Sequence, residues 1–159
     1  MTIPDNFSAE ERSERAMAFF HKGYNCSQAV AMAFSDIMGL DEKTVAALAT
    51  GFGGGMGRMR EVCGTVSGMA LVSGFLVPAC DESTVKTQKA ANYALVQSLA
   101  GEFKEMNGSI ICRELLGLSP SVKETHVPAE RTSEYYKKRP CEELVGISAG
   151  ILARKILSL

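Results

Sequence analysis

The sequence predicts an all-α fold, a single-domain bundle of six or seven helices over residues 1–159. Three observations lead to this fold class. Apolar residues recur three and four positions apart, the apolar segments start at capping residues and stop at glycine or proline, and no stretch alternates apolar with polar residues as a strand would. A chain of 159 residues can bury roughly two thirds of its unfolded surface in one core.

Three helices are expected in the first third of the chain, over residues 8–22, 25–38 and 41–50. The first begins with the capping-box pattern Ser-Ala-Glu-Glu and stops before Gly23. The second has one apolar stripe and ends at Gly39. The third is short and follows an aspartate, which is a favoured capping residue.

A glycine-rich loop at 51–58 leads into a small-residue central helix over 63–77. The loop matches neither dinucleotide-binding nor P-loop glycine spacing, so it is interpreted as flexible backbone that gives access to a cysteine. Gly64 and Gly68 lie four residues apart, a spacing that lets another helix approach closely. Residues 62–80 carry no charge, but their glycines, serines and proline favour a buried helix over a membrane span.

The last third is expected to hold a long helix over 83–106, a short helix over 109–116, and a final helix from Pro140 to the end. The intervening residues 117–138 are polar and contain two prolines. We expect them to form an irregular surface excursion, and this segment is called the excursion below.

The composition excludes two classes of partner. A net charge of −1 provides no basic surface for nucleic acid or an anionic membrane. The N-terminus lacks the basic and apolar regions of a signal peptide, and the five cysteines are an odd number. We therefore expect reduced thiols in a cytoplasmic protein without membrane insertion.

Four of the five cysteines are predicted to lie in the first turn of a helix, at the start of its apolar stripe. These are Cys26, Cys63, Cys112 and Cys141; Cys80 fits neither rule. A helix N-terminus stabilises a thiolate by about 0.3–1 kcal/mol when exposed and about 2 kcal/mol when partly buried. Lowering a thiol pKa from about 8.5 to about 7 needs roughly 2 kcal/mol, so neighbouring cations would have to help. The candidates are Arg58, Arg60, Arg113, Lys137, Lys138 and Arg139.

The motifs Asn-Cys-Ser-Gln at 25–28, Gly-Gly-Gly-Met at 53–56 and Cys-Gly-x-x-x-Gly at 63–68, followed by Cys112 and Cys141, resemble a known family. It is the C_GCAxxG_C_C family of redox-active proteins, named for its four cysteines, and the resemblance covers about residues 11–155. It implies a redox role for the same four cysteines and leaves Cys80 outside the pattern. Thr65 stands where the family usually has alanine.

Three functions remain open at this point. The first is thiol–disulfide chemistry or electron transfer, with Cys26 and Cys63 as the favoured pair and Cys112 with Cys141 as the second. The protein would then be a thiol-dependent oxidoreductase that needs no cofactor. The second is an iron–sulfur cluster or zinc held by the same four thiolates, although their long separations differ from the usual local spacings. The third is a helical module whose cysteines only pack.

Other polar and aromatic residues are assigned non-catalytic roles. His21 and His126 are expected to be solvated, and Gln28 to be a polar group on the side of a helix. Tyr135 and Tyr136 are expected to anchor the excursion by packing. The substrate, the redox partner and the oligomeric state, including a homo-oligomer, stay open.

Overall fold

The computed structural model describes residues 1–121 and 123–159, and 65% of the chain is helical. The described residues contain no strand, only an isolated antiparallel bridge between Val62 and Ile111, so the all-α prediction is confirmed. Within those described residues, six helices have seven residues or more, in agreement with the six or seven expected. In chain order the elements are α1 (Ala9–His21), α2 (Cys26–Met32), α3 (Ser35–Met38), α4 (Glu42–Ala49), the 3₁₀ turn η1 (Thr50–Phe52), α5 (Gly53–Met56), α6 (Gly64–Leu76), α7 (Val85–Asn107), α8 (Cys112–Leu115), α9 (Ser133–Lys138) and α10 (Cys141–Ser158).

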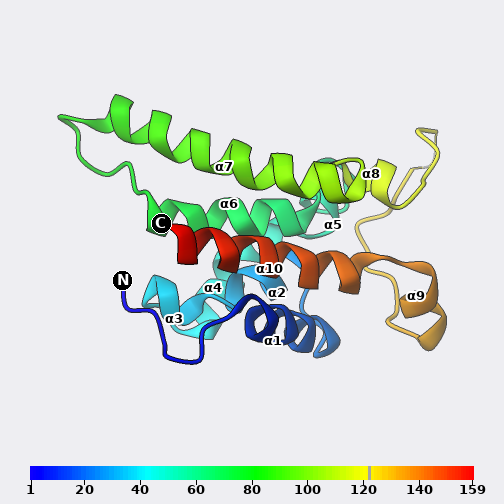
Figure 1. Ribbon diagram of the computed structural model, residues 1–159. Helices are drawn as coiled ribbons and strands as arrows, with labels where there is room; N and C mark the ends of the chain where they lie inside the picture. Colours follow the sequence, from blue (N-terminus) through cyan, green and yellow to red (C-terminus); the bar gives the residue numbers. More distant parts are fainter. Residues whose placement is uncertain (122) are drawn as a thin grey trace.

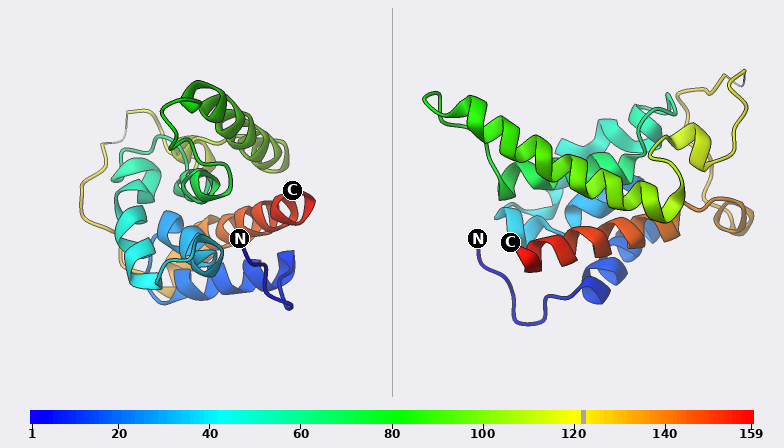
Figure 2. Two further views of the ribbon diagram at one scale, coloured as in Figure 1. Left: turned by 90° about the vertical axis from the view of Figure 1, so that its left-hand side faces the viewer. Right: turned by 45° about the horizontal axis from the view of Figure 1, so that its top comes forward.

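The small-residue helix α6 is central, as predicted, and packs against α2, α7 and α10. Figures 1 and 2 show α7 and α1 on opposite sides of α6 and α10, with both chain termini at one end of the bundle and α9 at the other. Gly68 permits the close contact with α2, because a Cβ there would lie 3.0 Å from the carbonyl oxygen of Ser27. The predicted use of the 64–68 glycine pair is confirmed.

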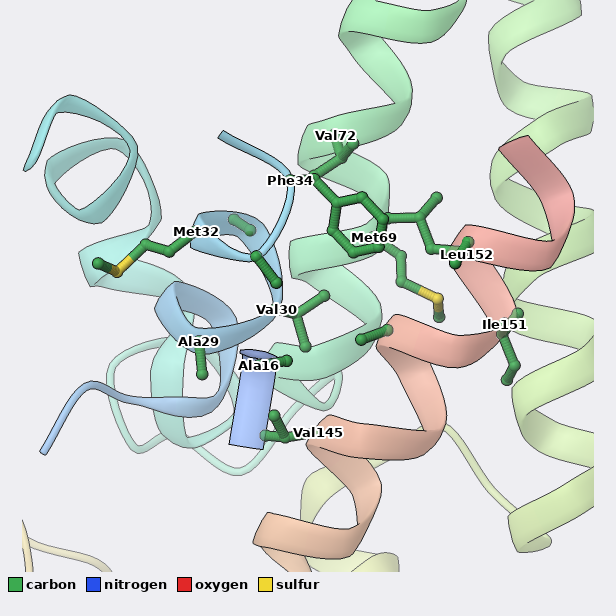
Figure 3. Close-up of a cluster of buried hydrophobic side chains, with 14 of the residues drawn as sticks. Ala16, Ala29, Val30, Met32, Phe34, Met69, Val72, Val145, Ile151 and Leu152 are labelled. Atoms are coloured by element: carbon green, nitrogen blue, oxygen red, sulfur yellow. The ribbon is translucent and has the colours of Figure 1, made fainter. Parts of the chain in front are cut away.

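The apolar core is built from buried side chains of α1, α2, α3, α4, α6, α7 and α10. Figure 3 shows Met69 of α6 beside Leu152 of α10, with Val72 of α6 and Val30 of α2 in the same cluster and Ile151 on another side of α10. All five side chains are buried, so each favours the folded state by about 1.5–3 kcal/mol. This core holds the helix starts that carry the cysteines. In the described part of the chain, no helix combines the length and hydropathy needed to cross a bilayer.

The helix predicted over 25–38 is broken between α2 and α3, and a distant arginine accounts for the break. In a continuous helix the carbonyl of Ala33 would accept from the N–H of Ile37. Instead it accepts from the guanidinium of Arg12, and the N–H of Ile37 donates to the carboxylate of Asp36 at 2.9 Å. The break therefore comes from a tertiary contact.

Candidate functional site

The four cysteines of the predicted site line one cavity of about 450 Å³. They come from the starts of α2, α8 and α10 and from the residue before α6. Cys26 and Cys141 are partly exposed, Cys63 and Cys112 are buried, and all are free thiols. Cys80 is exposed and does not line the cavity. Segments 37, 49 and 29 residues apart thus bring four sulfurs into one space, which is what the sequence analysis expected.

Cys26 is positioned by a complete capping box at the start of α2. The Asn25 side chain accepts from the N–H of Gln28 at 2.9 Å, and the Gln28 side chain accepts from the N–H of Asn25 at 3.0 Å. Both amides also reach the end of α4, where Asn25 donates to the carbonyl of Thr50 and Gln28 to that of Ala46. The sequence analysis placed Gln28 only on a helix side, although an N-x-x-Q pattern is itself a capping signal.

Cys63 and Cys112 are held together by the short antiparallel bridge. The N–H of Cys63 donates to the carbonyl of Ile110 at 2.8 Å, and the N–H of Cys112 donates to that of Glu61 at 2.6 Å. The helix over 109–116 was predicted to begin at Ser109, but α8 begins at Cys112. The correction has a local cause, since the Ser109 hydroxyl accepts from Ile111 at 3.0 Å and the bridge keeps this segment extended.

Glycines allow the thiol-bearing segments to come this close. A Cβ on Gly64 would overlap the sulfur of Cys26, and one on Gly55 would lie 2.6 Å from the Cβ of Cys112. The glycine loop was expected to give access to Cys63, and that expectation is wrong. Cys63 is only 6% exposed, because the absence of side chains lets neighbouring backbone close around it.

The loop itself is a left-handed turn, part of it forming α5. Five consecutive residues, 54–58, have positive φ angles, and two of them, Met56 and Arg58, are not glycine. The backbone N–H groups of Gly54, Ser27 and Cys26 act on the sulfur of Cys26 and oppose the rise in its pKa. The backbone thus surrounds Cys26 with donors that favour a thiolate.

Burial nevertheless dominates the protonation of these thiols. It raises the pKa of Cys63 to about 12 and that of Cys141 to about 11, and it raises the pKa of Cys26 despite the backbone donors. Negative charge on Cys26 would further raise the pKa of both Cys63 and Cys141. The sequence analysis found that a helix start alone is too weak to lower a thiol pKa to about 7, and at these three thiols desolvation exceeds what the helix start and nearby cations supply.

A cation contacts the sulfur of Cys112. The Arg60 Nη1 lies 3.7 Å from the Cys112 sulfur, and its Nε donates to Glu124 at 3.2 Å. Arg58 donates to the other oxygen of Glu124 at 3.0 Å. Burial lowers the Arg60 pKa, but the hydrogen bond to Cys112 and the charge of Glu124 outweigh it, so that pKa is raised. Burial likewise acts to raise the pKa of Glu124, and Arg60 with Arg58 reverses the shift.

The excursion differs from its prediction in two respects. It contains the helix α9, which begins where the Thr132 hydroxyl accepts from the N–H of Tyr135. It also forms one wall of the cavity, contributing His126, Pro128, Ala129, Arg131 and Tyr135. Residue 122 lies outside the described residues. The role of Glu124 as a link to the glycine turn left no signal in the sequence, because it joins residues more than 60 positions apart.

Arg131 fastens the excursion to the first two helices. Its guanidinium donates to the carbonyls of Phe20 at 2.6 Å and Tyr24 at 2.8 Å, and lies 3.9 Å from the Phe20 ring centroid. Tyr136 packs edge-on against Phe20, and Tyr135 packs against Tyr136, so both tyrosines anchor the excursion as expected.

The two histidines differ in their surroundings. His21 stacks on the Tyr136 ring at 4.8 Å between centroids and contacts Glu142, so it is packed as well as half-exposed. His126 is exposed, as expected, and also lines the cavity.

Among residues 1–121 and 123–159, no group of three or more histidine, cysteine, aspartate or glutamate side chains is arranged to hold a metal ion. The four sulfurs share a cavity in this conformation without forming a coordination cage. A four-thiolate centre would require the cysteine side chains to turn toward a common point.

Comparison with known families decides the affiliation of the chain. The model of the family described as "Putative redox-active protein (C_GCAxxG_C_C)" matches residues 24–155. The chain belongs to the C_GCAxxG_C_C family. The matched region of this C_GCAxxG_C_C protein contains all four cavity cysteines and the glycines that pack against them. No curated protein matches the chain, and neither does any solved structure.

Proposed function

We propose that this protein carries out thiol–disulfide exchange in a reducing cytoplasm, with Cys26, Cys63, Cys112 and Cys141 as its redox-active residues. The observation that carries the proposal is the convergence of four free thiols from distant segments on one cavity. Structural cysteines would have no reason to share an accessible space. The family description supports a redox role.

Cys26 is the proposed attacking residue and Cys63 the resolving one. Cys26 is partly exposed in the cavity, and three backbone N–H groups stabilise negative charge on its sulfur. After losing its proton to solvent, its thiolate attacks a substrate disulfide R–S–S–R, forming a mixed disulfide and releasing one RS⁻. Cys63 loses its proton and displaces the second RS⁻. The protein loses two electrons in forming the Cys26–Cys63 bond, and the substrate gains them as two thiols.

Cys112 and Cys141 are proposed as the second pair. Arg60 contacts the sulfur of Cys112, an interaction that strengthens when that sulfur is negatively charged. Negative charge on either Cys26 or Cys112 acts on Cys141, so the two pairs are electrostatically connected. Electrons can then be passed from one pair to the other by the same exchange chemistry.

Counting free thiols in the native protein tests this function. Treatment with a mild disulfide oxidant should lower the thiol count by two or four, and dithiothreitol should restore it. Peptide mapping should locate a Cys26–Cys63 bond. The matched control is Cys80→Ser, which removes an exposed thiol outside the cavity and should leave this bond unchanged. An unchanged thiol count in native protein, with thiols that react only after unfolding, would show that the cysteines merely pack.

The alternative function, binding of an iron–sulfur cluster or zinc, is tested by the metal content of the purified protein. Four thiolates in one cavity are a ligand set that suits an iron–sulfur cluster or zinc. Protein purified without oxygen would then contain stoichiometric iron and absorb visible light, or contain stoichiometric zinc. Removing the metal would raise the free-thiol count by up to four.

A further inference from the structure

The cavity wall is strongly cationic, although the chain has a net charge of −1. Its described lining includes no carboxylate and no lysine, but it includes Arg58, Arg60, Arg131 and Arg139, together with His126. Among the described residues, Arg60 is the only arginine that contacts a cavity sulfur, so thiol chemistry alone does not account for this concentration of arginines. It indicates a ligand that carries negative charge.

Most of this positive charge is not neutralised by the protein. Arg58 and Arg60 share the single carboxylate of Glu124. Arg131 donates to two backbone carbonyls, which satisfy its hydrogen bonds but carry no net charge. In the described chain, Arg139 makes no ion pair with a carboxylate, and its guanidinium lies 5.9 Å from the Tyr135 ring centroid. Its positive charge opposes the rise in the pKa of Cys141 caused by burial, so this charge acts on the Cys141 thiol.

Much of the rest of the wall is apolar and suits a carbon chain rather than a bare inorganic ion. Its apolar side chains are Phe20, Leu115, Leu116, Pro128, Ala129 and Leu144. A volume of about 450 Å³ lies in the range of sites for small organic ligands. Guanidinium groups bind carboxylates in a planar, two-point geometry. The wall therefore matches a small organic molecule with carboxylate ends.

We infer that the substrate of this site is a small organic disulfide that carries carboxylate groups, with Arg139 binding a carboxylate beside Cys141. The inference rests on the proposed thiol–disulfide function and adds the class of substrate. In the exchange, the two electrons and two protons lost by the protein thiols convert the dicarboxylate disulfide into two carboxylate-bearing thiols. No further oxidant is required.

Three disulfides of similar length test this inference. They are 3,3′-dithiodipropionate with two negative charges, 2-hydroxyethyl disulfide with none, and cystamine with two positive charges. The oxidation rate of the reduced protein is measured by mass spectrometry of quenched samples, and each rate is divided by the rate for free cysteine. The normalised rates should fall from the anionic to the neutral to the cationic disulfide.

Arg139 variants identify the residue responsible. Arg139→Gln should lower the ratio of anionic to neutral rates about tenfold, and Arg139→Lys should lower it less. The matched control is Lys138→Gln, which removes a positive charge at the position next to Arg139. The Lys138 side chain is 73% exposed and does not line the cavity. It should leave the ratio unchanged. Thermal unfolding of each variant checks that the fold is intact.

The outcomes separate this inference from the proposed function. If none of the three disulfides oxidises the native protein, thiol–disulfide exchange fails. If the protein is oxidised but the normalised rates do not depend on charge, the exchange function stands and the carboxylate inference is overturned. A rate ratio that Arg139→Gln leaves unchanged overturns the role of Arg139.

Discussion

At the scale of single residues, two effects compete at Cys26, Cys63 and Cys141, and burial is the stronger. Helix starts and backbone N–H groups surround the sulfur of Cys26, yet its pKa is raised. Cys63 lacks even a side-chain cap on its helix and is closely surrounded by protein. Unliganded thiols at these positions therefore stay protonated at neutral pH. This protects a reduced site from indiscriminate oxidation, because the thiolate is the reactive form.

Because these thiol pKa values are raised in the folded state, the free energy of unfolding should decrease as the pH rises through the alkaline range. Below about pH 9 the thiols are protonated in both states, so their preference for the folded state is fully present. Above that pH the unfolded state loses thiol protons while native Cys63, with a pKa of about 12, keeps its own. Each such thiol should lower the free energy of unfolding by about 1.4 kcal/mol per pH unit. Urea unfolding between about pH 9 and 11 should show a shallower decline for Cys63→Ala than for Cys80→Ala. If the free energy of unfolding declined equally with pH in the two variants, the raised pKa of Cys63 would be contradicted.

At the scale of elements, the glycine turn and the excursion act together around the thiols. The turn brings Arg58 and Arg60 to the surface of the cavity, and Glu124 of the excursion binds both. The excursion is thereby tied to the turn at one point and, through Arg131, to the end of α1 at another. Two polar contacts close the wall over a site whose remaining lining is mostly apolar.

Breaking the Glu124 contact should loosen this wall. Glu124→Gln removes the charge that both arginines share, and a contact weaker by about 1 kcal/mol corresponds to roughly fivefold more frequent opening. The alkylation rate of Cys112 under native conditions should rise by that factor. Glu130→Gln, which changes an exposed glutamate of the same excursion, should not alter it. A Cys112 rate unaffected by Glu124→Gln would show that Glu124 does not hold the excursion closed.

At the scale of the whole molecule, α1 precedes the matched family region yet packs against both α2 and α10. Its Arg12 is 1% exposed and donates to both carboxylate oxygens of Asp36, at 2.6 and 2.8 Å. The guanidinium also lies 4.5 Å from the Phe7 ring centroid. Although burial acts to raise the Asp36 pKa, the hydrogen bonds and charge of Arg12 outweigh it and lower that pKa.

Loss of Arg12 should therefore destabilise the entire bundle. Arg12→Met leaves the Asp36 carboxylate with only the more distant Arg15 and the Ala33 carbonyl without its donor, and should lower the free energy of unfolding by about 3–5 kcal/mol. The matched variant Arg15→Met removes a guanidinium whose side chain is 29% exposed and lies 3.8 Å from Asp36. It should cost less than about 1 kcal/mol. Urea unfolding at pH 7 measures both, and similar values for the two variants would contradict the assignment.

Sequence reasoning succeeded where structure depends on local signals. Ser8 caps α1, Gly108 ends α7 in a left-handed conformation, and Cys26, Cys112 and Cys141 lie in the first turns of α2, α8 and α10 as predicted. It failed where contacts are distant in sequence. Neither the break caused by Arg12 nor the contact between Glu124 and the glycine turn has a local pattern. Burial of Cys63 was missed for the same reason, since it depends on which segments fill the space that the glycines leave.

The chain contains no tryptophan, and three of its four tyrosines, at positions 24, 135 and 136, lie where the excursion meets the first two helices. Tyr135 is part of the cavity wall. The intrinsic ultraviolet emission of this protein therefore originates mainly at the boundary of the thiol site. Entry of a molecule or movement of the excursion can be followed in real time by tyrosine fluorescence, without attaching a dye.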